Sequence, residues 1–462
     1  MSRHFERVTV VERDHLPRVA EHRSGVPQSH HVHALLLRGS RELERTFPGI
    51  ADELIAAGAS RMDLGGELAY CSEFGWVPPV GVGITPMVLS RILLESVVRA
   101  RALSDVANLH LLEGTRLTGL VTERNGDHLR VVGVKTNHPE HRELRGDLVV
   151  DASGRSSKCL AFLAADGVAE PPIEMVDAHS GYASRFYELA PDENRWWRGM
   201  LIEGKAPTRR RWGLLMPIEH GRCVVTLGGV NGEYPPADEP GFMEYLNSLP
   251  TRALAREIAR AKPLSKIHAH RSLYNRARHF ERWTERVGGF VTLGDAAVAF
   301  NATYGQGMSM AATAANALGD TLGTYPDADA FALTQRFHKA QWAHLKTAWQ
   351  IASGADLEWP GTEGKRPFAF GLKLALAATV VRASHELPQI KRLYAPIYQL
   401  VGSPWTLVRP DLVALVAYAG LRRSLGRPLV RLPPIDCPTF AQDHLPPLQE
   451  QAPLHASLQP RA

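Results

Sequence analysis

A buried strand that ends on an acid and leads into a glycine-rich turn restricts the fold of this chain more than any other feature. Residues 288–294 (GGFVTLG) are predicted to form that strand, which brings Asp295 to its carboxyl end. A Gly-Gln-Gly turn then opens a helix, roughly residues 307–322, made mostly of Ala, Ser, Thr and Met. Ligands bind at the carboxyl ends of strands in open α/β sheets, and a helix N-terminus favours an anion. The pattern predicts an α/β domain with a ligand site at Asp295; a glycine-rich loop before a buried helix is the alternative interpretation.

Two further strands are also expected to end on an acid. Residues 7–12 (RVTVVE) end on Glu12, at the position where an acid of a dinucleotide fold accepts hydrogen bonds from ribose hydroxyls. A charged strand end is the simpler interpretation of Glu12. Residues 149–157 (VVDASGRSS) carry Asp151 into a turn of small residues, where backbone N–H groups can approach a phosphate and Arg155 adds a positive charge. A turn without a ligand is the alternative there.

The glycine loop that should accompany such a site is not found. In a dinucleotide fold this loop lies about 20 residues before the ribose-binding acid, but only eleven residues precede Glu12. The nearest match elsewhere, residues 81–86 (GVGITP), ends on proline and does not follow a strand. We therefore expect that the first strand, the glycine loop and most of the first helix are missing, and that Met1 is an internal start of a longer reading frame.

The rest of the sequence divides by its pattern of apolar residues. An amphipathic helix is predicted at residues 86–102, and residues 172–286 alternate like sheet strands around a predicted helix at 241–261. Residues 368–425 are predicted to be helical and broken by prolines. The predicted organisation is an α/β domain in pieces (1–60, 86–171 and 286–330), a β-rich substrate domain (61–85 and 172–285), a helical C-terminal region (331–430) and a disordered proline-rich tail (431–462).

Composition excludes several classes of protein. The net charge of +5 is mild, and no nucleic-acid-binding signature is present, so we expect no nucleic acid partner. Four cysteines without a CxxC pair argue against a zinc site or a disulfide framework and favour a reducing, cytoplasmic setting. The N-terminus lacks an apolar signal core, and no run of 18 apolar residues occurs.

The order of these motifs resembles the FAD-dependent monooxygenases of the p-hydroxybenzoate hydroxylase type. The resemblance is closest to the bacterial branch near squalene epoxidase and the polyether epoxidases, and it spans about residues 1–330. Besides VVDASGRSS and VTLGDAAVAFNATYGQGMSMA, it covers four further stretches: GVPQSHHVHALL (25–36), LSRILLE (89–95), LLMPIEHGRCVVTLGG (214–229) and NRARHFERW (275–283). The resemblance implies a Rossmann-like FAD-binding domain, without its first βα unit, into which a β-sheet substrate domain is inserted.

The resemblance also implies roles for individual residues. Glu12 would hold the adenosine ribose of FAD, and Arg91 would lie near the ribityl–phosphate chain. The turn with Asp151, Gly154 and Arg155 would be shared by FAD and NAD(P)H. The remaining implied cofactor-binding residues are Gly294 and Asp295, at the ribityl or pyrophosphate region, and Gly305, Gln306, Gly307 and Met308, which would approach the isoalloxazine ring and stabilise negative charge at its N1–O2 edge.

The reaction implied is insertion of one oxygen atom, by hydroxylation or epoxidation, into a small organic or isoprenoid- or polyketide-like substrate. Reduced FAD would react with O₂ to give a flavin hydroperoxide, with electrons from NAD(P)H or a reductase. No general base stands out, so the catalytic residues stay unassigned; oxygen activation belongs to the flavin in such enzymes. Two alternatives stay open: reduction of isoprenoid double bonds, as in geranylgeranyl-reductase relatives, and a non-catalytic remnant. Halogenation is disfavoured because the W-x-W-x-I-P motif is absent.

Two clusters outside these motifs are also notable. His30, His31 and His33 form a dense group that lacks nearby acids or cysteines, so lining of the flavin pocket or a structural role is favoured over a metal. Residues 363–431 contain eleven Lys or Arg and three Asp or Glu, together with apolar stretches. Helices packed on the flavin domain with a basic outer face are the favoured interpretation, and peripheral membrane contact is the alternative.

Overall fold

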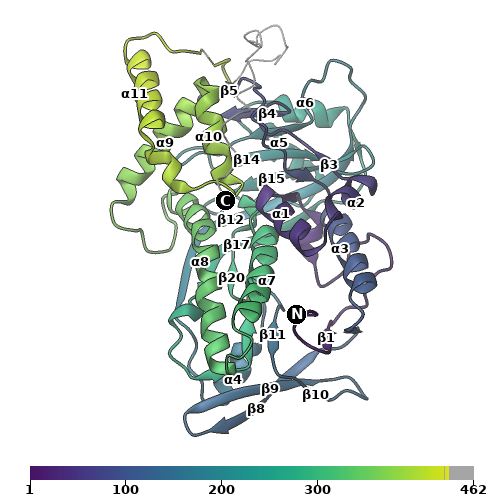
Figure 1. Cartoon of the computed structure of the whole chain (residues 1–462). Helices are drawn as coiled ribbons and strands as arrows, with labels where there is room; N and C mark the ends of the chain where they lie inside the picture. The colour runs from purple at the N-terminus through teal and green to yellow at the C-terminus, as the bar shows by residue number, and fades with distance from the viewer. Residues whose placement is uncertain (431, 436–462) are drawn as a thin grey trace.

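The computed structural model describes residues 1–430 and 432–435. A large mixed sheet lies above a second part, in which two long antiparallel helices cover short parallel strands, and a group of helices packs beside the large sheet (Figure 1). The predicted class is confirmed: an α/β protein with a Rossmann-like part, an inserted β-sheet and a helical C-terminal region. The predicted domain boundaries stay predictions, and the tail at 436–462 lies outside the described residues.

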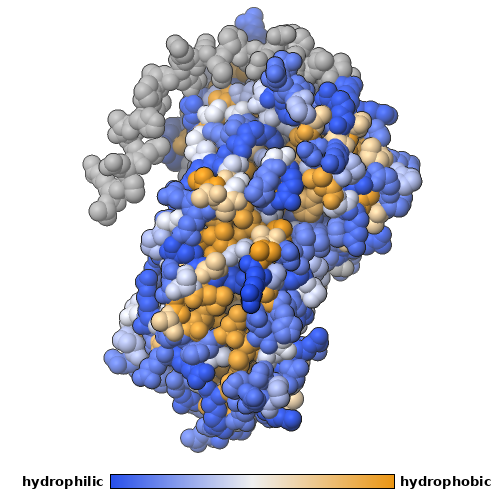
Figure 2. Space-filling model, turned by 90° about the vertical axis from the view of Figure 1, so that its right-hand side faces the viewer, coloured by the Kyte–Doolittle hydropathy of each residue, from blue (hydrophilic) through white to orange (hydrophobic). Residues whose placement is uncertain are grey.

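Each strand that leads to a motif acid has a parallel partner, and the two pairs form separate sheets. Strand β1 (Val8–Val11) pairs with β7 (Leu109–Leu112), and β11 (Val149–Asp151) pairs with β19 (Phe290–Thr292). Within the described residues, neither β1 nor β11 has a second partner. These strands lie toward the side of the molecule that Figure 2 presents, where apolar side chains gather in a band down its middle.

The predicted amphipathic helix starts later than its sequence pattern indicates. Residues Met87–Val88 form strand β6, and helix α3 (Arg91–Asp105) follows. Ser90 is the N-cap, and its side chain accepts a hydrogen bond from the Leu93 N–H at 3.2 Å. This serine cap satisfies one of the free donors of the first turn, and it makes Arg91 the first residue of the helix.

The large sheet is nine-stranded among the described residues and forms the β-rich layer. Its central strand β12 (Ile173–Glu188) pairs with β17 (His268–Arg278) on one side and β15 (Arg222–Gly229) on the other. Strand β14 (Arg211–Pro217) pairs with β15 as an antiparallel hairpin that includes the stretch LLMPIEHGRCVVTLGG (214–229). The predicted helix at 241–261 is two helices, α5 (Glu239–Asn247) and α6 (Ala253–Ala259), because Pro250 and its neighbours interrupt it. The other strands of the sheet are β4 (Leu68–Ser72), β5 (Gly75–Val77), β13 (Gly199–Ile202), β16 (Lys262–Pro263) and β20 (Val298–Ala299).

Two long helices support the strand that ends near Asp295. Helix α7 (Gly307–Thr324) packs against α8 (Ala330–Leu357) and, on another side, against α1 (Leu37–Thr46). The approach of α1 to α7 is close, because a Cβ atom at Gly39 would lie 2.5 Å from Ser309 Oγ. The small residues predicted for α7 therefore serve close packing around the start of that helix.

The C-terminal region is helical, as expected. It consists of α9 (Phe370–Glu386), α10 (Pro388–Tyr398), the 3₁₀ helix η5 (Pro404–Val408) and α11 (Pro410–Ser424). Pro388, Pro404 and Pro410 each stand at the first position of an element, whereas Pro396 lies inside the last turn of α10 and does not break it. In the part of the chain that the structure describes, no helix is long and apolar enough to cross a membrane.

Candidate functional site

The turn that carries Asp295 and the start of helix α7 lie next to each other. Asp295 stands in a short 3₁₀ helix (Gly294–Ala296) directly after β19, and a Cβ atom at Gly307 would lie 3.8 Å from Asp295 Oδ1. Gly305 has φ +65°, a left-handed conformation that turns the chain into the helix. The strand thus delivers the carboxylate to the point where the α7 N–H groups begin, as the sequence predicted.

Three arginines surround this carboxylate. Burial raises the pKa of Asp295, while the positive charges of Arg155, Arg276 and Arg91 oppose that rise. The Arg91 guanidinium also donates a hydrogen bond to Met308 Sδ at 3.5 Å. Helix α3, the turn after β11 and strand β17 therefore bring cations to the same place as the α7 N-terminus.

The first turn of α7 has free hydrogen-bonding capacity. The N-cap residue Gln306 makes no side-chain capping bond, so the first N–H groups of the helix are not satisfied by a cap. The Gln306 side chain is buried, and its Oε1 has no hydrogen-bond partner among the described residues. A half-buried carboxylate, uncapped N–H donors and nearby guanidinium groups suit a ligand with both hydroxyl and anionic groups, so these residues fit the ribityl and ring edge of a flavin.

Asp151 has a mainly local role. Its carboxylate accepts hydrogen bonds from the Ser153 N–H at 3.0 Å and from the hydroxyls of Ser153 and Ser157. Gly154 has φ +82°, and a Cβ atom there would meet nothing within 4 Å. These hydrogen bonds stabilise the turn, so the Asp151 carboxylate shapes the loop. A ligand could contact the loop at Gly154, where its side is open.

Arg155 joins the second motif to the third. Its guanidinium donates to the carbonyl oxygens of Tyr274 at 2.9 Å and Phe300 at 2.8 Å, and it lies over the Tyr274 ring. Arg276 in turn donates to the Arg155 carbonyl oxygen at 2.9 Å. These backbone contacts fix the turn after β11 against strand β17 and the loop before Gly305.

Glu12 is linked to Arg91 through a chain of alternating charges. Arg23 Nη1 lies 3.4 Å from Glu12 Oε2, and Arg23 Nε donates to Glu95 Oε1 at 2.7 Å. Glu95 Oε2 lies 3.7 Å from Arg91, one turn earlier on α3. The structure therefore brings Glu12, Arg91 and Met308 into one connected set of side chains, and the charge of Arg91 also acts on Asp295.

A polar cluster lies on the face of the large sheet. His31 is buried, and its Nδ1 lies 2.9 Å from Ser184 Oγ, which lies 2.7 Å from Thr226 Oγ1. Burial lowers the pKa of His31 to about 3 and, together with the Arg91 charge, that of His33 to about 4. Both rings are therefore neutral at pH 7. No group of residues able to hold a metal is found in the described part of the chain.

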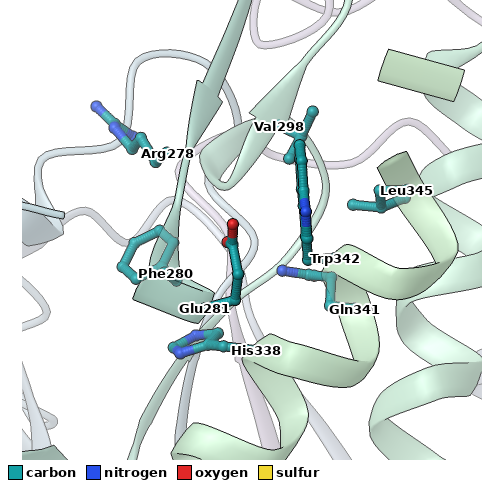
Figure 3. Close-up of a pocket in the computed structure, with 8 residues that line it drawn as sticks. All are labelled: Arg278, Phe280, Glu281, Val298, His338, Gln341, Trp342 and Leu345. Carbon is teal, nitrogen blue, oxygen red and sulfur yellow. The ribbon is translucent and has the colours of Figure 1, made fainter. Parts of the chain in front are cut away.

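A cavity adjoins the residues at the start of α3. A cavity of about 240 Å³ lies beside Ser90 at the N-terminus of α3; its other lining side chains include the stacked imidazoles of His22, His30 and His268. Another, of about 10 Å³, lies between α8 and the end of β17, with His338 and Gln341 on one side and Phe280 and Glu281 on the other (Figure 3). It is the size of one water molecule and holds none of the predicted site residues.

A buried carboxylate supports the loop that precedes Gly305. Asp356 near the end of α8 is 1% exposed, and it accepts hydrogen bonds from Tyr304 OH at 2.6 Å and from Asn301 Nδ2 at 3.0 Å. Asn275 on β17 donates to the same carboxylate at 2.7 Å and accepts from the Asn301 N–H at 2.7 Å. Burial raises the pKa of Asp356 to about 7. The hydrogen bonds of Asp356, Asn275, Asn301 and Tyr304 therefore fix the loop before Gly305 against α8 and β17.

Sequence reasoning did not single out Arg23, Glu95, Arg276 or Asp356. The spacing of Glu95, four residues after Arg91 on a predicted helix, was a usable signal. Asn301 and Tyr304 lie inside the quoted motif, but nothing in the sequence indicated their partner. Asp356 is 52 residues further along the chain than Tyr304, and its contact depends on how α8 packs.

Substitution of Gly305 by Ala tests the turn at the site. We expect Gly305→Ala to lower the free energy of unfolding by about 1–2 kcal/mol, because an L residue is strained at positive φ, and to weaken FAD binding several-fold. Gly126 (φ +58°), in the hairpin between β8 (Leu117–Asn125) and β9 (His128–Thr136), is a matched control, since a Cβ atom meets nothing at either position. Gly126→Ala should cost similar stability and leave FAD affinity unchanged; equal FAD affinities for both variants would contradict the assignment.

The sequence of this chain is similar to that of a mycobacterial protein. No protein-family model matches the chain. Protein Rv3254 of Mycobacterium tuberculosis is 29% identical over 377 residues, which are 78% of this chain and 77% of that protein.

Solved structures with a similar fold are flavoenzymes. The flavin-dependent brominase Bmp2 aligns with a TM-score of 0.61 at 13% identity, over 91% of this chain and 93% of its own. PqsL of Pseudomonas aeruginosa, in complex with 2-aminobenzoylacetate, aligns with a TM-score of 0.54 at 20% identity, over 76% of this chain and 88% of its own. The anhydrotetracycline hydroxylase OxyS of Streptomyces rimosus aligns with a TM-score of 0.55 at 17% identity, over 85% of this chain and 70% of its own. The chain therefore has the fold of FAD-dependent monooxygenases, as the motif resemblance predicted, and it shares that fold with flavin-dependent halogenases.

Proposed function

We propose that this protein is an FAD-dependent oxidoreductase, and specifically a monooxygenase that inserts one oxygen atom into a small organic substrate. The observation that carries the proposal is the convergence of Asp295, Arg91 and the uncapped start of α7 in a flavoenzyme fold. Two motifs about 200 residues apart in the sequence, LSRILLE (89–95) and VTLGDAAVAFNATYGQGMSMA, contribute these groups, and together they offer a carboxylate, a guanidinium group and free N–H donors to a partly anionic cofactor.

Each part of the site has a proposed task. Asp295 accepts hydrogen bonds from ribityl hydroxyls, and Arg91 lies along the ribityl–phosphate chain. The N–H groups of Gly307 and Met308 stabilise negative charge at the edge of the isoalloxazine ring, since they begin an uncapped helix. Glu12, at the far end of the charge chain, holds the adenosine ribose, and the open turn at Gly154 adjoins the cofactor. Bound FAD supplies the redox chemistry with O₂.

The protein's further contribution is orientation of the substrate. We propose that the substrate lies between the flavin ring and the face of the large sheet that carries His31 and Tyr182, whose rings contact edge to face at 4.3 Å. The neutral imidazole of His31, held by Ser184, offers a hydrogen bond without adding charge. We propose NAD(P)H as the electron donor. Three free, buried cysteines, Cys71, Cys159 and Cys223, support a reducing, cytoplasmic location.

Oxygen consumption tests the reaction class. The FAD-loaded protein should consume O₂ when NADPH or NADH is supplied, and candidate substrates incubated under ¹⁸O₂ should gain one labelled oxygen atom. Substrate reduction that proceeds without O₂ would instead support a double-bond reductase. A protein that binds FAD but neither oxidises NAD(P)H nor accepts electrons from a reductase would contradict an enzymatic role.

A further inference from the structure

The helices after residue 365 expose an unusual amount of apolar surface. Nineteen large apolar side chains are exposed in the described part of the chain, and ten of them lie within residues 368–425. Phe368 is 95% exposed, Leu372 74% and Trp405 78%. Scattered apolar residues are normal on a protein surface, but gathered ones mark an interaction site. We therefore expect that these exposed side chains contact another molecule or a membrane surface.

Helix α11 is apolar on two opposite sides. Leu412, Val416 and Ala419 are buried against α9 and α10. At 100° per residue the opposite side of the helix carries a stripe that is exposed to solvent. The exposed apolar residues of that stripe are Ala414, Ala417, Tyr418, Leu421 and Leu425. A helix that is apolar on both sides is expected only where both sides have a partner.

The first half of helix α9 has little packing against the protein. Val380 and Ala383 in its second half are buried, whereas Leu372 and Leu376, one turn apart, are exposed. Phe368 lies two residues before the start of this helix. We call the exposed residues of α9 and α11, with Phe368 and Trp405, the C-terminal apolar face.

The segments that carry this face are rich in positive charge. Residues 363–430 carry ten Lys or Arg and three Asp or Glu, and each of the three acids already has a partner: Glu363 lies 3.2 Å from His179, Glu386 pairs with Arg423 and Asp411 pairs with Arg409. Among the described residues, Lys365, Lys373, Arg422 and Arg427 form no ion pair. A second copy of the chain would bring the same positive charges against each other, whereas an anionic surface would be attracted.

We propose that the C-terminal apolar face docks the protein on the surface of a membrane that contains anionic lipids. Apolar side chains enter the boundary between headgroups and acyl chains, and lysine and arginine side chains contact lipid phosphates. Trp405 has the amphipathic ring that prefers that boundary. The attachment is peripheral, in keeping with the described helices, none of which can span a bilayer. The docking does not depend on flavin binding.

Co-sedimentation with vesicles tests the proposal on the full chain. We expect binding to vesicles of phosphatidylcholine mixed with phosphatidylglycerol, much weaker binding to phosphatidylcholine alone, and release by high salt. The double variants Leu372→Ser/Leu376→Ser and Leu421→Ser/Leu425→Ser, and separately Lys373→Glu/Arg427→Glu, should each lower the partition coefficient by about tenfold or more.

The control is a pair of exposed apolar residues elsewhere. Ile55 on α2 (Ile50–Ala56) and Leu103 on α3 are also exposed, at 41% and 48%, and Ile55→Ser/Leu103→Ser should leave vesicle binding unchanged. Circular dichroism confirms that each variant is folded. The proposal is overturned if the wild type does not bind the anionic vesicles or if the control lowers binding as much as the face variants. It is also overturned if light scattering shows a dimer that the face variants dissociate, since the face would then be a subunit interface.

Discussion

Replacement of Asp295 by Asn is expected to weaken FAD binding by about 10- to 100-fold, the loss of one hydrogen bond to a charged group. The carboxylate lies beside the start of α7, and among the described residues its oxygens accept no hydrogen bond, so it is available to the ribityl hydroxyls. Titration of the FAD-free protein with FAD, followed by quenching of flavin fluorescence, measures the dissociation constant.

The unfolding temperature separates a binding role of Asp295 from a structural role. A structural role predicts that Asp295→Asn lowers the unfolding temperature of the FAD-free protein. We expect no such decrease, because burial disfavours the charged carboxylate. The exposed Asp127, in the turn between β8 and β9, is the control, and Asp127→Asn should leave FAD affinity unchanged. If Asp295→Asn binds FAD as tightly as the wild type, the assignment of Asp295 is wrong.

The second large effect concerns Asp356 and pH. The pKa of this carboxyl is about 7 in the folded protein and about 3.9 in an unfolded chain. Between these values the folded state holds a proton that the unfolded state has lost, so stability falls as pH rises, by up to about 1.4 kcal/mol per pH unit. Chemical denaturation from pH 5 to about pH 7.5 should show this loss, because the ionised carboxylate is buried.

Asp356→Asn isolates the contribution of this group. The amide does not ionise, so the difference in unfolding free energy between variant and wild type should shift in favour of the variant as pH rises. Asp127→Asn should show no such shift. The variant should also bind FAD more weakly at pH 8, because one of the donors from Asn275, Asn301 and Tyr304 then faces an N–H group instead of a carboxylate oxygen. At pH 5 the difference should be smaller, because the protonated wild-type carboxyl also presents a donor. A pH dependence equal to that of the wild type would contradict the raised pKa.

Local patterns in the sequence predicted the elements at the site well. The runs before Glu12, Asp151 and Asp295 are short, apolar and followed by turn residues, and each forms a parallel strand that ends on or just before the acid. The left-handed Gly305 and the start of α7 at Gly307 follow from the Gly-Gln-Gly sequence. The predicted start of a helix was less accurate, because α3 is capped by Ser90, four residues after its predicted start.

Contacts between distant residues could not be predicted in the same way. The chain Glu12–Arg23–Glu95–Arg91 depends on where the loop after β1 crosses α3, and the support of Tyr304 by Asp356 depends on the packing of α8. A single sequence carries no pattern for such pairs. The basic, apolar character of the C-terminal helices was visible in the sequence, but which side chains are exposed followed only from how α9, α10 and α11 pack together.

The visible absorption spectrum of the full chain, incubated with FAD and then desalted, tests whether Asp295 and the start of α7 form a flavin site. We expect that the two absorption bands of oxidised flavin stay with the protein and that Asp295→Asn loses them in the same procedure. A folded protein that elutes colourless, with all the FAD in the small-molecule fraction, would contradict the claim that the α7 N-terminus and Asp295 form a flavin site in this chain.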